Sequence, residues 1–213
     1  MSPRPVLTYF SSRGLAELIR LTLAEAAIAY EPRLLGVYPD LVAFNQLKET
    51  GVLPFGSVPL WEEPDGFTLV QSDTILRHVA RRGGLYGADA REAARCDMVY
   101  DGVKDVRAQL MRLRSIAEAE RPALRVELNT VVLPRWLGHF ERLLGERPHF
   151  AGSFSFADLA VAYLIEALRE NGLAGGLAET SRLVAFEARV SERPNIARHL
   201  ADPARFPPQL LPT

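Results

Sequence analysis

The pattern of apolar residues along the chain changes near residue 87, and this change limits the folds that the chain can adopt. Residues 1–86 alternate short strand-like runs with helix-like ones, in the order βαβ and then ββα. Such alternation is typical of an α/β unit. Over residues 87–213 the strand-like runs are gone and long helical periodicities replace them. The sequence therefore predicts an α/β domain over 1–86 followed by an all-α domain over 87–213.

Four short apolar runs before the change of pattern are expected to be strands. The runs at 6–10 and 30–35 flank a helical pattern, so the second strand can return parallel to the first. The runs at 57–61 and 67–70 flank a Pro-Asp-Gly turn, which predicts an antiparallel pair. A helix is then expected over 72–82, where a pair of glycines ends it.

The residues after the change of pattern predict helices only. Residues 90–119 place apolar side chains at roughly the 3.6-residue period of one helix face. Pro122 fits the first turn of the next helix. Ser155 and Asp158 form a Ser-x-x-Asp capping arrangement, and the run 159–165 that follows is apolar on all sides. This run is expected to be the buried central helix of the second domain.

Composition disfavours several classes of function. The 213 residues carry 25 basic and 26 acidic side chains, so the formal net charge of −1 provides no field that would attract nucleic acid. The longest apolar run, 159–165, is too short to span a bilayer, so we expect no membrane association. Cys96, the one cysteine, cannot form an internal disulfide, which favours a reducing, cytoplasmic compartment. The histidines are scattered without metal-ligand spacing, so no metal is expected.

Three places in the α/β region combine polar groups with the end of an element. Tyr9 closes the first strand ahead of a helix N-terminus, where a phenol can donate a hydrogen bond to a bound thiolate or can simply be packed. Gln71 and Ser72 open the later helix, either as a second point that favours an anion or as a plain N-cap. A cis Val58–Pro59 bond would present backbone groups to a peptide-like ligand; otherwise the proline only marks a sheet edge.

Several segments taken together resemble one family. Residues 9–17 (YFSSRGLAE), 54–59 (PFGSVP) and 71–77 (QSDTILR) resemble the cytosolic glutathione transferases of the tyrosine type. Residues 154–158 (FSFAD) resemble the capping motif of that family's second domain, so the resemblance covers the whole chain. The pi class is the closest, through residues 71–77 and 97–103 (DMVYDGV).

This resemblance implies a fold, an activity and an assembly. A thioredoxin-like domain would bind glutathione as the cosubstrate, an all-helical domain would offer an apolar site, and the chain would form a homodimer. The implied reaction is conjugation of the glutathione thiolate to small hydrophobic electrophiles, without a metal. A glutathione-binding carrier or a glutathione-dependent isomerase on the same fold stays open. A serine-type mechanism through Ser11 or Ser12 is less favoured, because Tyr9 occupies the tyrosine-type position.

The resemblance also implies roles for the residues at the three element ends. Tyr9 matches the catalytic tyrosine whose hydroxyl stabilises the glutathione thiolate. Gln71 and Ser72 match contacts to the γ-glutamyl carboxylate. Val58, together with Pro59, matches the backbone pairing with the cysteinyl unit of glutathione.

Other residues are implied to support this site or the dimer. Lys48 lies where related sequences place a lysine for the glycine carboxylate of glutathione, and Asp105 matches an acid that reaches the γ-glutamyl amine of the neighbouring subunit. Phe10 and Arg13 follow the catalytic tyrosine as supporting residues. Phe55 matches an aromatic side chain that some classes insert into a pocket of the partner subunit, with a place in this chain's own core as the alternative.

At four other positions the sequence departs from the pattern of this family. Phe44 stands where a tryptophan is usual and cannot donate a hydrogen bond. Leu15 and Ser57 replace polar residues that often help to bind glutathione, so a lower affinity is expected. Ser115 replaces an aromatic residue of the pi-class apolar site, so the preference for cosubstrates does not carry over.

Overall fold

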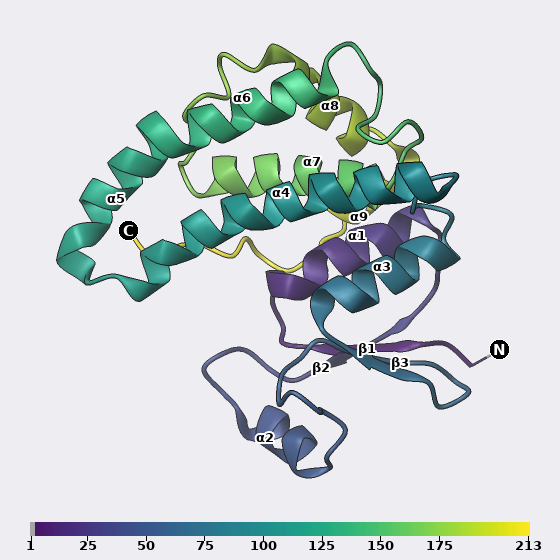
Figure 1. The fold of residues 1–213 in the computed structure, drawn as a ribbon. Helices are drawn as coiled ribbons and strands as arrows, with labels where there is room; N and C mark the ends of the chain where they lie inside the picture. Colours follow the sequence, from purple (N-terminus) through teal and green to yellow (C-terminus); the bar gives the residue numbers. More distant parts are fainter. Residues whose placement is uncertain (1–2) are drawn as a thin grey trace. The chain divides into compact units, whose positions relative to one another are not determined.

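The computed structural model describes residues 3–213, which form two compact units (Figure 1). The first unit contains the residues up to Leu85 together with Arg198–Pro207, and the second contains Tyr86–Ala197 together with Pro208–Thr213. The first unit is α/β and the second is helical, which confirms the fold class expected from the sequence. Residues 198–207 group with the α/β unit although they follow the helical residues in the chain.

A mixed four-stranded sheet forms the centre of the first unit. Its strands β1 (Val6–Tyr9), β2 (Glu31–Leu34), β3 (Leu60–Glu62) and β4 (Thr68–Val70) lie in the order β2-β1-β3-β4. Strand β1 is parallel to β2 and antiparallel to β3, and β3 is antiparallel to β4. The parallel return and the antiparallel pair are thus confirmed.

Helices lie on both sides of this sheet (Figure 1). A 3₁₀ turn, η1 (Gly14–Ala16), leads into α1 (Glu17–Glu25), which packs against α3 (Ser72–Arg82). Helix α2 (Val42–Glu49) lies on the opposite side of the sheet. Helix α1 is buried on all sides from Glu17 to Leu23, its polar residues included.

Helices make up the second unit. They are α4 (Ala90–Ser115), α5 (Arg121–Glu127), α6 (Leu133–Leu144), α7 (Phe156–Glu170), α8 (Ser181–Ser191) and the first residues of α9 (Pro194–Leu200), with short segments η2 (Glu118–Glu120) and η3 (Leu128–Val132). From Arg198 on, α9 belongs to the first unit. Helix α7 packs against α4 and α8. Within residues 3–213, no helix is both long enough and apolar enough to cross a membrane.

The helix expected from Pro122 onward is interrupted by a π-helical turn. Pro122 lies in the first turn of α5, as predicted, and Pro134 lies in the first turn of α6. Between these helices, η3 has π geometry. A proline inside a helix lacks a backbone donor, and its ring clashes with the carbonyl four residues earlier. The wider π turn admits Pro134 without ending the helical path.

The predicted capping arrangement holds the start of α7. Asp158 accepts hydrogen bonds from the backbone N–H and the hydroxyl of Ser155, at 2.9 and 3.0 Å, and from the backbone N–H of Phe150 at 3.0 Å. Its carboxyl is fully buried. Burial raises the pKa of this carboxyl, although the donors around it act to lower the pKa. The cap therefore joins the loop before α7 to the most apolar helix of the unit.

We expect Asp158→Ala to lower the free energy of unfolding by about 2 to 4 kcal/mol, because buried donors lose a charged acceptor. The control is Asp89→Ala. Asp89 caps α4 through the N–H groups of Arg91 and Glu92 but is exposed to solvent. Its loss should cost about 1 kcal/mol. Urea unfolding at one fixed protein concentration compares the two variants. Equal losses of unfolding free energy would show that burial of the Asp158 carboxylate does not increase its contribution to stability.

Candidate functional site

The register of the sheet brings three residues predicted for the site to one end of the strands. Thr8 of β1 lies opposite Leu60 of β3, and Leu60 lies opposite Val70 of β4. Tyr9 is the last residue of β1, Pro59 directly precedes β3 and Gln71 directly follows β4, so this antiparallel register puts the three residues at the same end of the sheet. Residues that are far apart in the sequence thus meet where these strands end.

Tyr9 presents a hydroxyl that is already held from one side. Its side chain is 9% exposed, and its hydroxyl accepts the backbone N–H of Leu15 at 3.0 Å. The Tyr9 carbonyl accepts the N–H of Leu35 at 3.0 Å, which fixes the end of β1. A phenol that accepts one hydrogen bond can still donate its own proton. The hydroxyl is therefore available to stabilise an anion such as a thiolate.

Gly14 lies directly against Tyr9, although no sequence motif assigned it a role. Its φ is +42°, and a Cβ at this position would lie 2.5 Å from the Tyr9 hydroxyl oxygen. Any side chain here would therefore displace the hydroxyl. The signal in the sequence was a glycine directly ahead of the helix that follows the tyrosine.

Gln71 and Ser72 lie where β4 meets the N-terminus of α3. Gln71 has φ 72° and ψ 112°, a rare backbone conformation for a residue other than glycine. Its carbonyl accepts the N–H groups of Thr74 and Ile75, both at 3.0 Å, but its side chain makes no capping hydrogen bond within the described residues. Ser72 is the first residue of the helix, and its hydroxyl donates to Asp73 at 3.3 Å. The Gln71 side chain is thus not used as a helix cap.

Val58 precedes β3, and the Val58–Pro59 peptide bond is cis, the first of the two alternatives that the sequence left open. Both residues are buried. The strand itself begins at Leu60 rather than at Ser57, which corrects the expected start. Pro59 has no N–H group to donate to a ladder, which accounts for the later start.

An aromatic path connects Tyr9 to Lys48 on α2. The ring of Phe10 lies 5.8 Å from that of Tyr9 and 5.6 Å from that of Phe44, measured between centroids. The Lys48 Nζ lies 5.7 Å from the centroid of the Phe44 ring. It also lies close to Gly56, since a Cβ there would be 3.8 Å from Nζ. Lys48 is exposed, so its ammonium group can meet a carboxylate.

The remaining predicted residues, Arg13, Asp105 and Phe55, differ in exposure to solvent, and Cys96 was not predicted for the site. Arg13 is 6% exposed, and its Nε donates to the carbonyl of Phe206 at 2.7 Å, so it supports the turn after Tyr9. Asp105 is exposed on α4 in the second unit. Phe55 is 71% exposed, so its alternative place in this chain's own core is wrong. Cys96 is buried in α4, and burial raises the pKa of its thiol.

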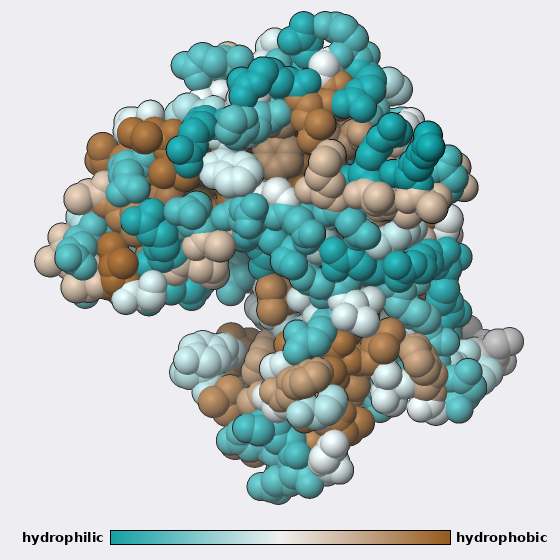
Figure 2. Space-filling model, viewed as in Figure 1, coloured by the Kyte–Doolittle hydropathy of each residue, from teal (hydrophilic) through white to brown (hydrophobic). Residues whose placement is uncertain are grey.

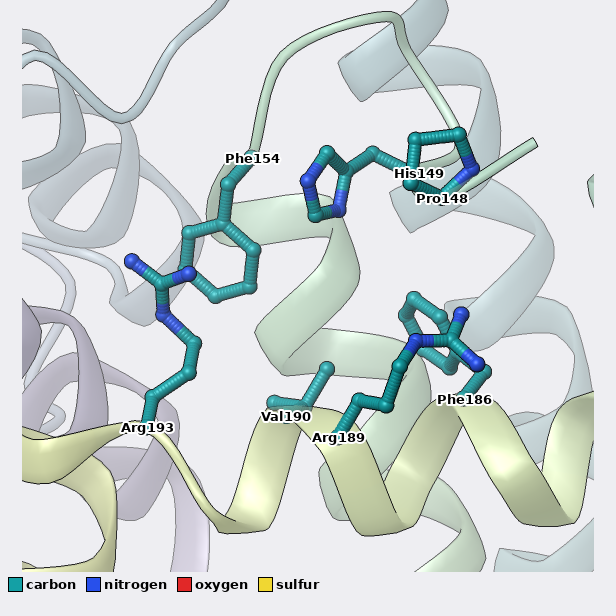
Figure 3. Close-up of a pocket in the computed structure, with 7 residues that line it drawn as sticks. All are labelled: Pro148, His149, Phe154, Phe186, Arg189, Val190 and Arg193. Carbon is teal, nitrogen blue, oxygen red and sulfur yellow. The ribbon is translucent and has the colours of Figure 1, made fainter.

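A separate cavity of about 280 Å³ lies within the second unit (Figure 3). It is lined by Pro148, His149, Phe154, Phe186, Arg189, Val190 and Arg193. The guanidinium carbon of Arg193 lies 3.6 Å from the centroid of the Phe154 ring, and this stacking is visible at the left of the close-up. The residues predicted for the site lie elsewhere in the chain.

Comparison with known proteins identifies the family of both domains. The family model for the N-terminal domain of glutathione S-transferases matches residues 5–81, and the model for their C-terminal domain matches residues 104–203. Glutathione S-transferase A from Cavia porcellus is 33% identical over 202 residues, covering 93% of this chain and 90% of the relative. Glutathione S-transferase alpha-2 from Rattus norvegicus is 32% identical over 203 residues, covering 94% and 89%.

A solved structure gives the same assignment. The pi-class glutathione S-transferase of Onchocerca volvulus superposes with a TM-score of 0.78 at 30% identity, covering 93% of this chain and 92% of that chain. The fold is thus a thioredoxin-like domain followed by a helical domain. The chain belongs to the glutathione S-transferase family and is a glutathione transferase.

We expect Gly14→Ala to lower kcat by about 10- to 100-fold, because the new methyl group pushes the Tyr9 hydroxyl out of position. Gly84→Ala is the matched control: Gly84 also has a positive φ, +68°, but nothing lies within 4 Å of its Cβ position. Steady-state kinetics at neutral pH compare the variants. Equal losses of kcat would assign the effect to backbone strain rather than to displacement of the hydroxyl.

Proposed function

We propose that Tyr9 is the catalytic residue and that glutathione binds along the strand ends where Tyr9, Pro59 and Gln71 lie. The observation that carries this proposal is the Tyr9 hydroxyl, held by the Leu15 N–H at the edge where these strand ends meet. Gln71 and Ser72 would receive the γ-glutamyl carboxylate at the N-terminus of α3, where the helix dipole favours an anion. Val58 would pair with the cysteinyl backbone.

Lys48 would contact the glycine carboxylate from α2. Its exposed ammonium group and its closeness to Gly56, two residues before Val58, support this role. Phe10 and Arg13 would support the site without touching the thiol. Glutathione would then extend from α3 to α2, with its sulfur near the Tyr9 hydroxyl.

The hydroxyl of Tyr9 would act by stabilising the thiolate form of glutathione. A thiol of ordinary pKa is mostly protonated at neutral pH, so lowering its pKa by about 1 to 2 units requires about 1.4 to 2.7 kcal/mol. One charge-assisted hydrogen bond supplies an amount of this order. The thiolate sulfur would then form a bond to the electrophilic carbon, and the leaving group would depart with the electron pair of the broken bond.

The electrophile would be a small hydrophobic molecule. Leu15, whose N–H holds the Tyr9 hydroxyl, has a side chain that is 42% exposed. An exposed apolar side chain next to the reacting atoms favours an apolar cosubstrate over a charged one.

A homodimer is the proposed assembly. Phe55 and three further apolar residues of the first unit, Val37, Tyr38 and Val42, are 64 to 72% exposed. Figure 2 shows hydrophobic side chains on the surface of this unit around α2. Apolar side chains gathered on a surface mark an interaction site. Phe55 would enter a pocket of the second copy, and Asp105 would reach the glutathione bound by that copy.

The class of glutathione transferase and the cellular location are also proposals. Relatives named alpha and a pi-class structure have similar identities to this chain, 32% and 30%, so the pi class stays a prediction. A cytoplasmic location is supported by the single cysteine, Cys96, which is buried and forms no disulfide.

Replacement of Tyr9 by phenylalanine should lower kcat by about 10- to 1,000-fold at neutral pH, because the thiolate loses its donor. Affinity for glutathione should stay the same, and the pH–rate profile should move upward. Retention on immobilised glutathione measures the affinity, and rates with a panel of electrophiles measure kcat and its dependence on pH. Ser11→Ala and Ser12→Ala are the controls. A Tyr9→Phe enzyme with full activity, beside an inactive serine variant, would sink the tyrosine assignment; retention of the wild type without turnover would favour a carrier.

The dimer is tested with two variants that should behave differently. Phe55→Ala should weaken the dimer by about 2 to 4 kcal/mol, the range of a buried aromatic anchor. Asp105→Ala should leave the dimer intact and weaken glutathione binding. Sedimentation over a range of protein concentrations, paired with activity at each concentration, separates the two effects. A fully active monomer would refute both the shared site and the inserted aromatic ring.

A further inference from the structure

Residues 198–207, which we call the C-terminal strap, contact the turn and the helix that follow Tyr9. The carbonyl of Phe206 accepts a hydrogen bond from Arg13 Nε at 2.7 Å. The Phe206 ring stacks on the guanidinium group of Arg20, whose carbon lies 4.7 Å from the ring centroid. The strap and the elements it contacts belong to the same compact unit.

A buried carboxylate ties the strap to the first turn of α1. The Glu17 side chain is 0% exposed; its Oε1 accepts Arg205 Nε at 2.8 Å and lies 3.2 Å from His199 Nε2. Burial alone would raise the pKa of Glu17, but hydrogen bonds from His199 and Arg205, with their charges, lower the pKa to about 2. Glu17 is therefore ionised at neutral pH; it holds Arg205 by an ion pair and lies within hydrogen-bond distance of His199.

Arg20 connects this carboxylate to the turn after Tyr9. Its Nη1 lies 3.1 Å from Glu17 Oε2 and donates to the carbonyls of Ser12 and Arg13, at 3.0 and 3.3 Å. The guanidinium carbon lies 6.0 Å from the centroid of the Tyr9 ring. The turn that Arg20 holds leads directly to Leu15, the donor to the Tyr9 hydroxyl.

We propose that the C-terminal strap positions the Tyr9 hydroxyl, with Arg205 and Phe206 as its positioning residues. The inference rests on the proposed catalytic role of Tyr9. Neither residue touches the reacting sulfur. They act through Glu17, Arg20 and the turn, which fix the Leu15 N–H and so the direction in which the hydroxyl donates. Catalytic groups must be held to within about 0.5 Å of the productive geometry, which a turn alone rarely ensures.

The experiment uses the full chain with Arg205→Ala and Phe206→Ala, and with Arg205→Lys and Phe206→Leu in case the alanine variants do not fold. Arg82→Ala is the matched control, because Arg82 forms a 2.6 Å ion pair with Glu63 elsewhere in the same unit. Hydrogen exchange at the Leu15 amide reports the turn and needs no glutathione. The ultraviolet absorbance of bound thiolate reports the pKa of the glutathione thiol, and kinetics give kcat and KM.

The strap variants should exchange the Leu15 amide on the order of tenfold faster, while the Val79 amide of α3 keeps its protection. The pKa of bound thiol should rise, and kcat should fall about tenfold, within the hundredfold that a 1 Å misplacement costs. KM for glutathione should change less than about twofold. The Arg82→Ala protein should match the wild type in all of these readouts.

Two outcomes would overturn the positioning role. Unchanged exchange at Leu15 in folded strap variants would mean that the strap does not hold the turn. A fall in kcat without a rise in the pKa of the bound thiol would assign the strap to stability alone. A wild-type protein that binds no glutathione as thiolate would refute the proposed role of Tyr9, and the catalytic part of this inference with it; the Leu15 readout would still separate the two failures.

Discussion

The register of the mixed sheet is the constraint on which the site depends. Strand β1 pairs with β2 on one side and β3 on the other, so the end of β1 is fixed by hydrogen bonds from both neighbours. The side-chain period of a strand is two residues, so a slip of one residue would turn Tyr9 to the opposite face of the sheet and move it away from Pro59 and Gln71. Leu7 lies opposite Trp61 and Thr8 lies opposite Leu60, and all four side chains are buried, so residues on both faces of the sheet are packed in this register.

Buried charge is the second organising interaction of the first unit. An isolated carboxylate in a protein interior is costly, and its cost is offset only where several donors surround it. Glu17 meets this condition with Arg20, Arg205 and His199. Because these partners come from two distant parts of the sequence, the ionic cluster specifies where the end of the chain returns to the α/β unit.

Most of the local structure could be predicted because the signals for it are local. The existence of the four strands, the turn between β3 and β4, the glycine stop after α3 and the cap of α7 each depend on residues that are near one another in the chain. The boundaries differ where packing decides them. Helix α4 ends at Ser115 rather than at 119, since Leu113 is the last of its buried residues and Ile116 is extended. The π turn before Pro134 likewise avoids a clash of the proline ring with the backbone, which the hydrophobic periodicity of the sequence does not reveal.

The sequence by itself determined the two fold classes, the tyrosine at a strand end and, through its motifs, the family. It determined these because hydrophobic period, turn chemistry and short motifs are written in neighbouring residues. Only the tertiary structure decided that Gly14 leaves no room for a side chain beside Tyr9, that Phe55 is exposed, and that residues 198–207 return to Glu17 and Arg20. Each of these depends on contacts between segments that the packing of the sheet and helices brings together, and no local pattern encodes such distances.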